Sequence, residues 1–420
     1  MPLPDLIEIV PLTQPVRAEI TVPGSKSITN RALILAALAD GETTLRGSLW
    51  SEDTQVMTEC LRELGFLVNV TDDLHEPCNR ILTVSGRSGK IPHGGTAERP
   101  LELFVGNAGT AARFLTAFLC LGEGAYRLHG VPRMHERPQA ALFAALRQLG
   151  YRIDSPNNKL PAVIHGTGSH TGSCRVSVAE SSQFASALLL TANVGGWTVQ
   201  VEGANEDELP YVEMTRALVK VFPSSGGEFQ IEPDASGGSY FWAAKLLGHD
   251  VRVAHWPVSG WQIDAEFPKF LPLPDSISRQ RDLGDSIMTA IVLAPFASRP
   301  VHFTELGRLR VQECERVAAL RAELTKCGAK VIEEGDTLTM FPSALHGAEI
   351  ETYNDHRMAM CFAVLGLKVP GIKIKNPDCV KKTFPNFFQK LAAAAPCGLG
   401  ATILDACTRQ PLSGAALFAD

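Results

Sequence analysis

Six stretches of the sequence are apolar on almost every side and long enough to form helices. A helix without a polar face has to be buried all round, so each stretch predicts a helix inside a core. The stretches are Ala32 to Ala39, Ala111 to Leu121, Phe184 to Asn193, Tyr240 to Leu247, Ile287 to Phe296 and Met358 to Leu367. Six buried helices in one chain favour a fold of six repeats packed around shared cores.

A strand-and-helix pattern alternates with these stretches. In each copy a strand-like run leads through a polar loop to an amphipathic helix, and glycine follows where a left-handed cap is wanted. The copies are 41–47 with a helix closed by Gly65, 125–130 with a helix closed by Gly150, 301–307 with a helix closed by Gly328 and, more weakly, 198–203 with a helix through Val221. They predict βα modules and an α/β fold.

Polar residues stand directly before each apolar helix. The segments are Ser25 to Ser27, Gly106 to Thr110, Ser181 to Gln183, Asp234 to Ser239, Gly284 to Ser286 and Asn354 to Arg357. Their Ser, Thr, Asp and Asn residues could act only as helix caps. Capping does not account for the cations Lys26, Arg31, Arg113, His356 and Arg357. Because helix starts carry unpaired N–H groups and partial positive charge, we expect an anion site here.

The composition excludes several classes of protein. The net charge is -6 and no long basic run occurs, so a nucleic-acid-binding surface is not expected. No apolar run reaches membrane-spanning length and no signal pattern opens the chain. The 10 cysteines are scattered without paired spacing, as in reduced proteins. We expect a cytoplasmic protein without a membrane partner, and 420 residues indicate two or three domains.

Further charged clusters complete the set. In Arg133 to Pro138, Pro138 suits the first position of a helix, which would place Arg137 at a helix start in need of an anionic partner. In Arg310 to Arg316, Glu313 and Arg316 are three residues apart and share a helix face. Nucleotide-binding loops and metal-ligand spacings are missing from the sequence. We therefore expect chemistry without metal or cofactor, performed by Lys, Arg, Asp, Glu and His on a substrate with several negative charges.

The motifs, in their order along the chain, resemble those of the 5-enolpyruvylshikimate-3-phosphate synthase family. They are Pro23 to Ser27 with Asn30 and Arg31, Gly106 to Thr110 with Arg113, Arg133 to Pro138, Ser181 to Gln183, Asn354 to Arg357 and Lys382 to Pro385. The resemblance implies transfer of the enolpyruvyl group of phosphoenolpyruvate to the 5-hydroxyl of shikimate 3-phosphate, with release of phosphate. This reaction belongs to the shikimate pathway to chorismate and the aromatic amino acids.

The resemblance also implies an architecture. It is a two-domain inside-out α/β barrel of six βαβαββ repeats, three per domain. The expected division is 23–232 for one domain and 1–22 with 233–391 for the other. Residues 392–420 match no repeat and are expected to form a loosely attached tail. The resemblance further implies a monomer whose partners are its two small-molecule substrates.

Site residues follow from the resemblance position by position. Those implied to surround phosphoenolpyruvate are Lys26, Gly109, Arg137, Arg316, Arg357 and Lys382. Those implied to hold shikimate 3-phosphate are Ser27, Arg31, Ser181, Ser182, Gln183, Tyr211, Asp285 and Gln312. Asp285 would accept the proton of the attacking hydroxyl, and Glu313 would protonate the methylene carbon of phosphoenolpyruvate and later take a proton back. Lys26 and His356 would support that transfer, and burial that raises the pKa of Glu313 would help it.

The sequence departs from the family pattern at four positions. Gln312 replaces a usual lysine, Glu208 a phosphate-binding serine, and Arg308 a common asparagine. We expect Arg308 to restore the charge that Gln312 lacks, so that binding of shikimate 3-phosphate is weakened at most. Phe114 replaces a proline after Arg113. It could tilt the helix that carries Gly109, and we expect glyphosate, an inhibitor shaped like phosphoenolpyruvate, to bind less well than in relatives with proline.

Two alternatives remain open. One is the enolpyruvyl transferase that acts on UDP-N-acetylglucosamine, which shares the fold. It typically has Lys-Asn-Ala where this chain has Lys26-Ser27-Ile28, and a reactive cysteine where this chain has none between Cys120 and Cys174. The other is a non-catalytic binding protein of the same fold, which Gln312 and Glu208 favour.

Overall fold

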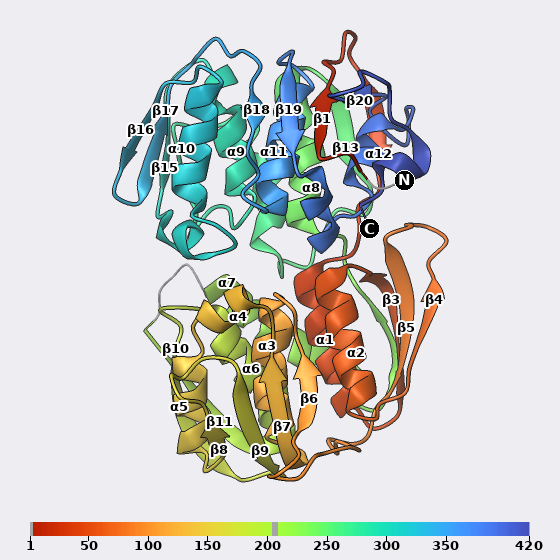
Figure 1. The fold of residues 1–420 in the computed structure, drawn as a ribbon, viewed down its shortest axis with the longest axis vertical. Coiled ribbons are helices and arrows are strands. Elements are labelled where there is room, and N and C mark those ends of the chain that lie inside the picture. The colour runs from red at the N-terminus through yellow and green to blue at the C-terminus, as the bar shows by residue number, and fades with distance from the viewer. Residues whose placement is uncertain (1–2, 204–208, 420) are drawn as a thin grey trace. The chain divides into compact units, whose positions relative to one another are not determined.

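The computed structural model describes residues 3–203 and 209–419. The chain divides into two compact units (Figure 1). The central unit is Gly24–Glu232, and the split unit combines the residues up to Pro23 with those from Pro233 onward. The N-terminal segment belongs with the C-terminal half because its strands β1 and β2 pair with β19 and β13 of that half.

The central unit contains ten strands and seven helices among its described residues. Its strands are β3 (Glu42–Leu49), β4 (Val68–Asp72), β5 (Asn79–Ser85), β6 (Leu101–Phe104), β7 (Glu123–His129), β8 (Arg152–Asp154), β9 (Ala162–Thr167), β10 (Gly172–Ser177), β11 (Trp197–Glu202) and β12 (Gly227–Gln230). Its helices are α1 (Lys26–Leu38), α2 (Glu52–Glu63), α3 (Gly109–Leu119), α4 (Pro132–Glu136), α5 (Ala140–Gln148), α6 (Ser182–Gly195) and α7 (Leu209–Val221).

The split unit is built from a similar set of elements. Its strands are β1 (Leu6–Ile9), β2 (Arg17–Ile20), β13 (Asp250–Val253), β14 (Ser276–Ser278), β15 (Val301–Thr304), β16 (Val331–Glu334), β17 (Thr337–Met340), β18 (Glu349–Ile350), β19 (Ile372–Lys375) and β20 (Ile403–Asp405). Its α-helices are α8 (Ala235–Trp242), α9 (Ile287–Leu293), α10 (Arg316–Lys326), α11 (His356–Gly366) and α12 (Phe387–Ala392). Its 3₁₀ helices are η2 (Ala243–Leu247), η3 (Ile263–Phe270), η4 (Ala294–Phe296), η5 (Gly307–Val311), η6 (Pro377–Lys382) and η7 (Gly414–Leu417).

The four-stranded sheets share one pairing scheme. Their orders are β12-β3-β5-β4 and β6-β7-β9-β8 in the central unit, and β14-β15-β17-β16 and β18-β19-β1-β20 in the split unit. In each sheet the first pair is parallel and the other two pairs are antiparallel. The two-stranded sheets, β10-β11 and β13-β2, consist of the parallel pair alone. The chain is thus a mixed α/β protein, as predicted.

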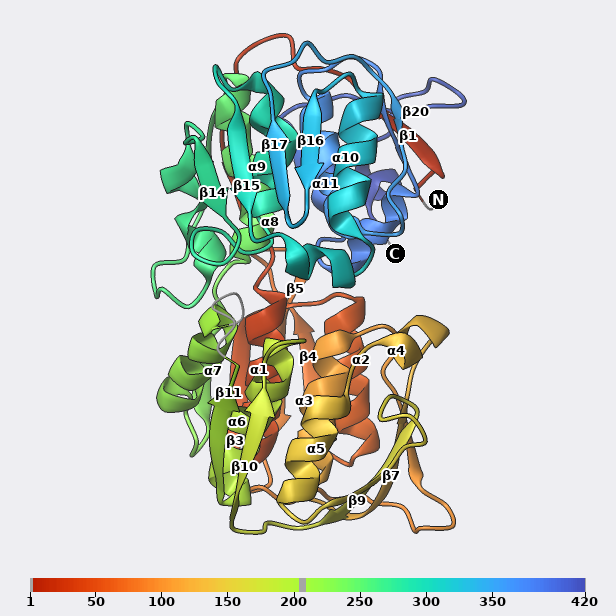
Figure 2. The same cartoon turned by 90° about the vertical axis from the view of Figure 1, so that its left-hand side faces the viewer.

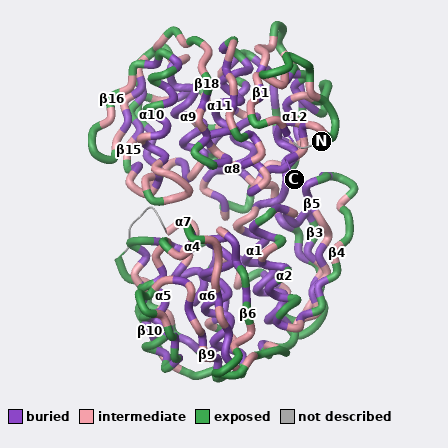
Figure 3. Tube along the Cα trace, viewed as in Figure 1, coloured by how far each residue is buried: buried purple, intermediate pink, exposed green. Residues whose placement is uncertain are grey.

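The six apolar stretches all form helices, which confirms that prediction. In the central unit α1, α3 and α6 pack on one another, and every residue of α3 is buried. In the split unit α11 packs on α8 and α9, and every residue of α9 is buried. Figure 2 shows these helices lying inside their own units with strands outside them, and Figure 3 shows how much of α1 and α11 is buried. Helix α9 stops short of Phe296 because Pro295 lacks the N–H group that a further turn needs.

The predicted strand-and-helix modules are confirmed as β3–α2, β7–α5, β15–α10 and β11–α7. Gly65 and Gly150 follow α2 and α5 with φ values of 88° and 91°, the left-handed conformation expected of closing glycines. Within the described residues, no helix has both the length and the apolar character needed to cross a membrane.

Within the described part of the C-terminal segment, residues 392–419 do not form a loosely attached tail, so that expectation is wrong. Strand β20 pairs with β1 through Ile7 and Asp405, Glu8 and Leu404, and Ile9 and Ile403. Leu399, Ile403 and Leu417 are also buried in the core of the split unit. The segment matches no repeat, yet its alternate apolar residues cover a sheet edge and are therefore held in place.

Candidate functional site

The N-termini of the buried helices differ in how their N–H groups are satisfied. In α6, α8 and α11, the side chains of Ser181, Asp234 and Asp355 accept hydrogen bonds from the first turn. At α9, Asp264 Oδ1 accepts from the N–H of Ser286 at 3.1 Å. Helices α1 and α3 begin without a side-chain cap. Capping thus explains the polar residues before four helices, whereas the starts of α1 and α3 are suited to an anion.

Lys26 lies at the first position of α1 and is held by a carboxylate. Its Nζ is 3.1 Å from Oδ2 of Asp53, which is buried at the start of α2. The turn before Lys26 needs Gly24, because a Cβ there would lie 1.9 Å from the carbonyl oxygen of Gly47. The N–H of Gly24 donates to Asn79 Oδ1 at 2.8 Å. The local fold therefore fixes the ammonium group at an uncapped helix start.

Arg31 is buried inside the central unit, with 1% of its surface exposed. It donates from Nε to Thr215 Oγ1 at 2.7 Å and from Nη2 to Ser186 Oγ at 3.0 Å. Its guanidinium also lies 5.1 Å from the ring centre of Phe114. Burial lowers the pKa of Arg31 to about 10, so it still carries its charge at neutral pH. A third bond, from Nη1 to the carbonyl oxygen of Ser27 at 2.9 Å, ties this cation to the start of α1.

Two guanidinium groups converge on the start of α3. Arg113 Nη1 donates to the carbonyl oxygen of Gly109 at 3.2 Å, and Arg137 Nη1 donates to that of Asn107 at 3.1 Å. A Cβ on Gly109 would lie 2.6 Å from Arg137 Nη2 and 2.9 Å from Arg113 Nη1. The absence of a side chain at Gly109 therefore lets both cations approach the uncapped end, which is an arrangement that attracts phosphate or carboxylate.

The helix boundary predicted beside Arg137 is wrong. Arg137 follows α4 as its C-terminal cap, and α5 begins only at Ala140, after Pro138 and Gln139. A cation at a helix C-terminus is favoured by the dipole, so this position alone does not demand an anion. Glu136 pairs with Arg133 at 2.6 Å.

Polar residues predicted to hold shikimate 3-phosphate lie at neighbouring helix starts of the central unit. Ser181 and Ser182 open α6 and are buried, and Ser181 Oγ accepts from the N–H of Gln183 at 3.2 Å. Tyr211 lies in the first turn of α7, which packs on α6. Arg31 Nη2 lies 3.5 Å from the carbonyl oxygen of Tyr211. Glu208, the predicted departure before Tyr211, lies outside the described residues.

In the split unit, Asp285 is surrounded by cations. Its Oδ2 lies 3.1 Å from Arg357 Nη2, and its Oδ1 lies 3.3 Å from Arg279 Nη2 and 3.8 Å from Arg316 Nη1. Gln312 Nε2 donates to Oδ1 at 3.3 Å. Burial alone would raise the pKa of Asp285, but the guanidinium groups of Arg357, Arg316 and Arg279 outweigh it and hold that pKa well below its usual range. The group is a carboxylate at neutral pH.

Glu313 lies between two cations. Its Oε2 is 2.9 Å from Arg316 Nη2 and its Oε1 is 3.1 Å from Lys382 Nζ. Arg316 is 1% exposed and also donates from Nε to Asp355 Oδ2 at 2.7 Å. Burial would lower the pKa of Arg316, but Asp355, Glu313 and Asp285 raise it instead. The predicted pair of Glu313 and Arg316 is confirmed, although α10 begins only at Arg316 and Glu313 precedes it.

His356 is the first residue of α11 and is buried. Its Nδ1 lies 3.8 Å from Asp355 Oδ1. The same oxygen accepts the N–H of Arg357 at 2.8 Å and thereby caps the helix. Asp355 therefore joins His356, Arg357 and Arg316 into one group.

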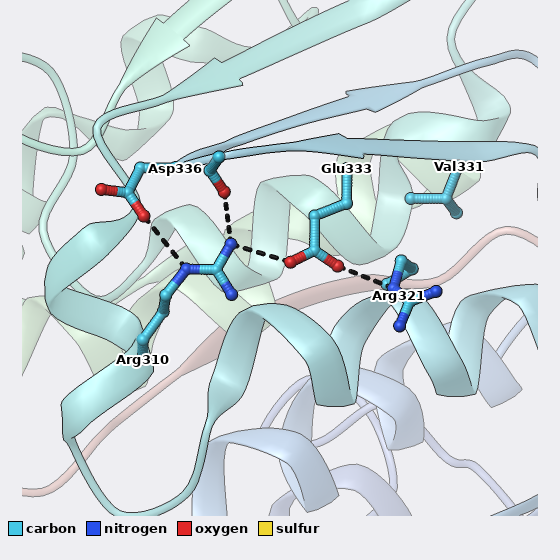
Figure 4. Close-up of a pocket in the computed structure, with 6 residues that line it drawn as sticks. Arg310, Arg321, Val331, Glu333 and Asp336 are labelled. Carbon is cyan, nitrogen blue, oxygen red and sulfur yellow. Dashed lines mark hydrogen bonds and ion pairs between the residues drawn. The ribbon is translucent and has the colours of Figure 1, made fainter.

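The split unit also has a shallow hollow of about 530 Å³ (Figure 4). Its lining residues are Arg310, Arg321, Val331, Glu333, Gly335 and Asp336. Arg310 donates to Glu333 at 2.8 Å and to Asp336 at 3.0 Å, and Arg321 lies 2.7 Å from Glu333. These charges neutralise one another. Arg310 thereby fastens η5, which precedes Gln312 and Glu313, to the β16–β17 hairpin.

Three charged residues of these groups were not predicted from the sequence. Asp53 pairs with Lys26, Asp264 caps α9 next to Asp285, and Arg279 contacts Asp285. Asp53 lies in an ordinary amphipathic helix, and Asp264 lies in η3, within a stretch whose sequence is rich in Gly and Pro. Arg279 is one of two arginines in Arg279-Gln280-Arg281, and no pattern in the sequence tells which of them points inward.

Comparison with known proteins gives one consistent family. The family model described as EPSP synthase (3-phosphoshikimate 1-carboxyvinyltransferase) matches residues 10–225 and 279–391. A 3-phosphoshikimate 1-carboxyvinyltransferase of Trichormus variabilis is 38% identical over 92% of this chain and 98% of its own length. One from Opitutus terrae is 38% identical over 93% of this chain and 98% of its own length.

A solved structure has the same fold. EPSP synthase from Acinetobacter baumannii superposes with a TM-score of 0.75 at 22% sequence identity, over 95% of this chain and 99% of that one. At this identity the likeness establishes the fold alone.

Proposed function

The chain belongs to the EPSP synthase (3-phosphoshikimate 1-carboxyvinyltransferase) family, and from this premise we propose that it transfers the enolpyruvyl group of phosphoenolpyruvate to the 5-hydroxyl of shikimate 3-phosphate. Phosphate is the second product. The observation that carries the proposal is the group in the split unit, where Asp285 and Glu313 stand among four cations, Arg279, Arg316, Arg357 and Lys382. Paired carboxylates among fixed cations suit proton transfer on anionic substrates.

Each unit forms one domain of a two-domain inside-out α/β barrel, with three βαβαββ repeats per domain. The shared pairing scheme of the four-stranded sheets supports this repeat, and the two-stranded sheets would be its reduced form. The domains are 23–232, and 1–22 with 233–391. Residues 392–420 add β20 to the second domain.

Phosphoenolpyruvate carries a phosphate and a carboxylate and needs several cations. Lys26, Gly109 and Arg137 of the central unit bind it at helix starts that lack side-chain caps. Arg316, Arg357 and Lys382 of the split unit complete its set of ligands. All five charged groups are held by neighbouring residues before substrate arrives, so little side-chain freedom is lost on binding.

Shikimate 3-phosphate offers a phosphate and hydroxyl groups. Ser27, Ser181, Ser182, Gln183 and Tyr211 bind it in the central unit. Asp285 and Gln312 bind it in the split unit. Arg31 supports this site through other residues, because its guanidinium donates hydrogen bonds to the backbone of Ser27 and to the hydroxyl of Ser186.

The reaction is an addition followed by an elimination. The 5-oxygen of shikimate 3-phosphate attacks C2 of phosphoenolpyruvate while Glu313 delivers a proton to C3, and the hydroxyl proton passes toward Asp285. The C2–O bond to phosphate then breaks, and a proton leaves C3 for Glu313. Lys26 and His356 support this transfer. Since the cations disfavour protonated Asp285, that carboxylate orients the hydroxyl and passes its proton to the departing phosphate.

The protein acts as a cytoplasmic monomer on these two small molecules, with no nucleic-acid or membrane partner. The absence of a nucleic-acid partner rests on the acidic net charge of -6, and the two small-molecule partners rest on the activity named for its relatives.

The test is the release of phosphate from phosphoenolpyruvate in the presence of shikimate 3-phosphate, with wild type, Glu313→Gln and Glu334→Gln. Glu334 is exposed on β16 and serves as the matched control. Wild type and Glu334→Gln should be active, and Glu313→Gln should lose about a hundredfold or more in kcat, as for removal of a general acid–base group. An inactive wild type, or a fully active Glu313→Gln, would refute the proposal.

A further inference from the structure

Arg279 is a buried cation that the reaction scheme does not use. It is 2% exposed and follows β14 directly. Its N–H donates to the carbonyl oxygen of Thr304 at 3.1 Å, which extends the pairing of β14 with β15 by one residue. The pairing of β14 with β15 therefore fixes the backbone of Arg279.

A tight turn decides which arginine of Arg279-Gln280-Arg281 points inward. Ser278 Oγ accepts from the N–H groups of Gln280 and Arg281 at 3.1 and 3.0 Å. Asp282 Oδ2 accepts from the N–H of Ser278 at 2.9 Å and closes the turn. Arg281 is left 75% exposed in an ion pair with Asp282, whereas Arg279 is buried.

Arg279 and Gln312 meet the same atom. Arg279 Nη2 and Gln312 Nε2 each lie 3.3 Å from Asp285 Oδ1, whereas Arg357 forms an ion pair with Oδ2. Two groups this close to one oxygen lie close to each other. Arg316 Nη1 also lies 3.8 Å from this oxygen and donates to Gln312 Oε1. A neutral amide is compatible with both guanidinium groups, but a cation in place of Gln312 would be repelled by them.

We propose that Arg279 is a positioning residue of the reaction, which holds Asp285 Oδ1 ionised and oriented for the acceptor hydroxyl and thereby requires a neutral side chain at position 312. The inference rests on the proposed function. Arg279 acts through Asp285, because its guanidinium contacts Oδ1 of that carboxylate. Its guanidinium is one of three that hold the pKa of Asp285 low. The other charged group that acts on Asp285, Glu313, opposes this effect.

The test compares Arg279→Met, Arg279→Lys, Gln312→Lys and the double variant Arg279→Met/Gln312→Lys, with Arg281→Met as the matched control. Loss of a charged hydrogen bond should lower kcat/KM for shikimate 3-phosphate about tenfold to a hundredfold in Arg279→Met, while KM for phosphoenolpyruvate stays within about twofold of wild type. Arg279→Lys should recover part of the loss. Gln312→Lys alone should lower activity, yet added to Arg279→Met it should restore part of the loss, because a cation then lies beside Oδ1 in place of Arg279.

The inference is overturned if Arg279→Met behaves like Arg281→Met, or if Gln312→Lys fails to restore the double variant. An inactive wild type would instead refute the proposed function. The contact itself is then tested by urea unfolding of Arg279→Met, Asp285→Asn and their double variant. The midpoint shift of the double variant should be smaller than the sum of the two single shifts, because one contact is lost in both, and strictly additive shifts would overturn the inference.

Discussion

Replacement of Asp355 by asparagine tests the most buried charge of the site. Asp355 is fully buried, its Oδ1 caps α11, and its Oδ2 lies 2.7 Å from Arg316 Nε. Asparagine keeps the size of the side chain and an oxygen that can cap the helix. The substitution Asp355→Asn therefore removes the negative charge and the acceptor oxygen that faces Arg316 Nε.

The magnitude follows from what Arg316 retains. Removal of one partner from a buried ion pair costs about 3 to 5 kcal/mol, because the other charge is left uncompensated. Arg316 keeps Glu313 at 2.9 Å and Asp285 at 3.8 Å. We therefore expect a loss at the lower end, about 3 kcal/mol. For a unit of this size that corresponds to a fall of about 6 to 12 °C in the unfolding temperature.

Scanning calorimetry measures the effect, with Asp378→Asn as the control. Asp378 forms a surface pair with Lys381 at 2.7 Å, and such pairs contribute about 0 to 1 kcal/mol. If Asp355→Asn unfolds within about 1 °C of Asp378→Asn, the account of Asp355 as the counter-ion of Arg316 is wrong.

Three further predictions concern other parts of the site. Gly109→Ala should fold normally and raise KM for phosphoenolpyruvate several-fold, because the added methyl group would displace the Arg137 guanidinium from its place 2.6 Å away; an unchanged KM in steady-state assays would count against that role of Gly109. Glyphosate should inhibit Phe114→Pro more strongly than wild type, and equal inhibition constants would remove the idea that Phe114 weakens its binding. Arg310→Met should lower the unfolding temperature more than Arg321→Met, since Arg310 joins η5 to the β16–β17 hairpin whereas Arg321 is half exposed and pairs with Glu333; equal shifts in a thermal melt would contradict this.

Much of the fold could be predicted because its signals are local. Apolar residues on every side of 111–121 and 358–367 require burial wherever those helices pack, and α3 and α11 are buried accordingly. The glycines after α2 and α5 report a backbone conformation that only a few residues tolerate. The prediction for the segment 392–420 failed because β20 has only three residues, and because its pairing with β1 depends on contacts with the opposite end of the chain.

For a related reason, the sequence predicted the cations of the site but not the residues that hold them in place. Cations at helix starts are visible in the sequence, and so Lys26, Arg113 and Arg357 could be singled out. The residues that hold them are recruited by the fold from distant segments, as Asp53 is for Lys26. Arg279 is the clearest case, because only the turn at Ser278 separates it from its exposed neighbour Arg281.

The most direct test of the proposed function is mass spectrometry of the products formed from phosphoenolpyruvate with either shikimate 3-phosphate or UDP-N-acetylglucosamine as acceptor. We predict the enolpyruvyl ether of shikimate 3-phosphate with one phosphate released per molecule, and no product from the nucleotide sugar. Product from UDP-N-acetylglucosamine alone, or from neither acceptor, would contradict the account.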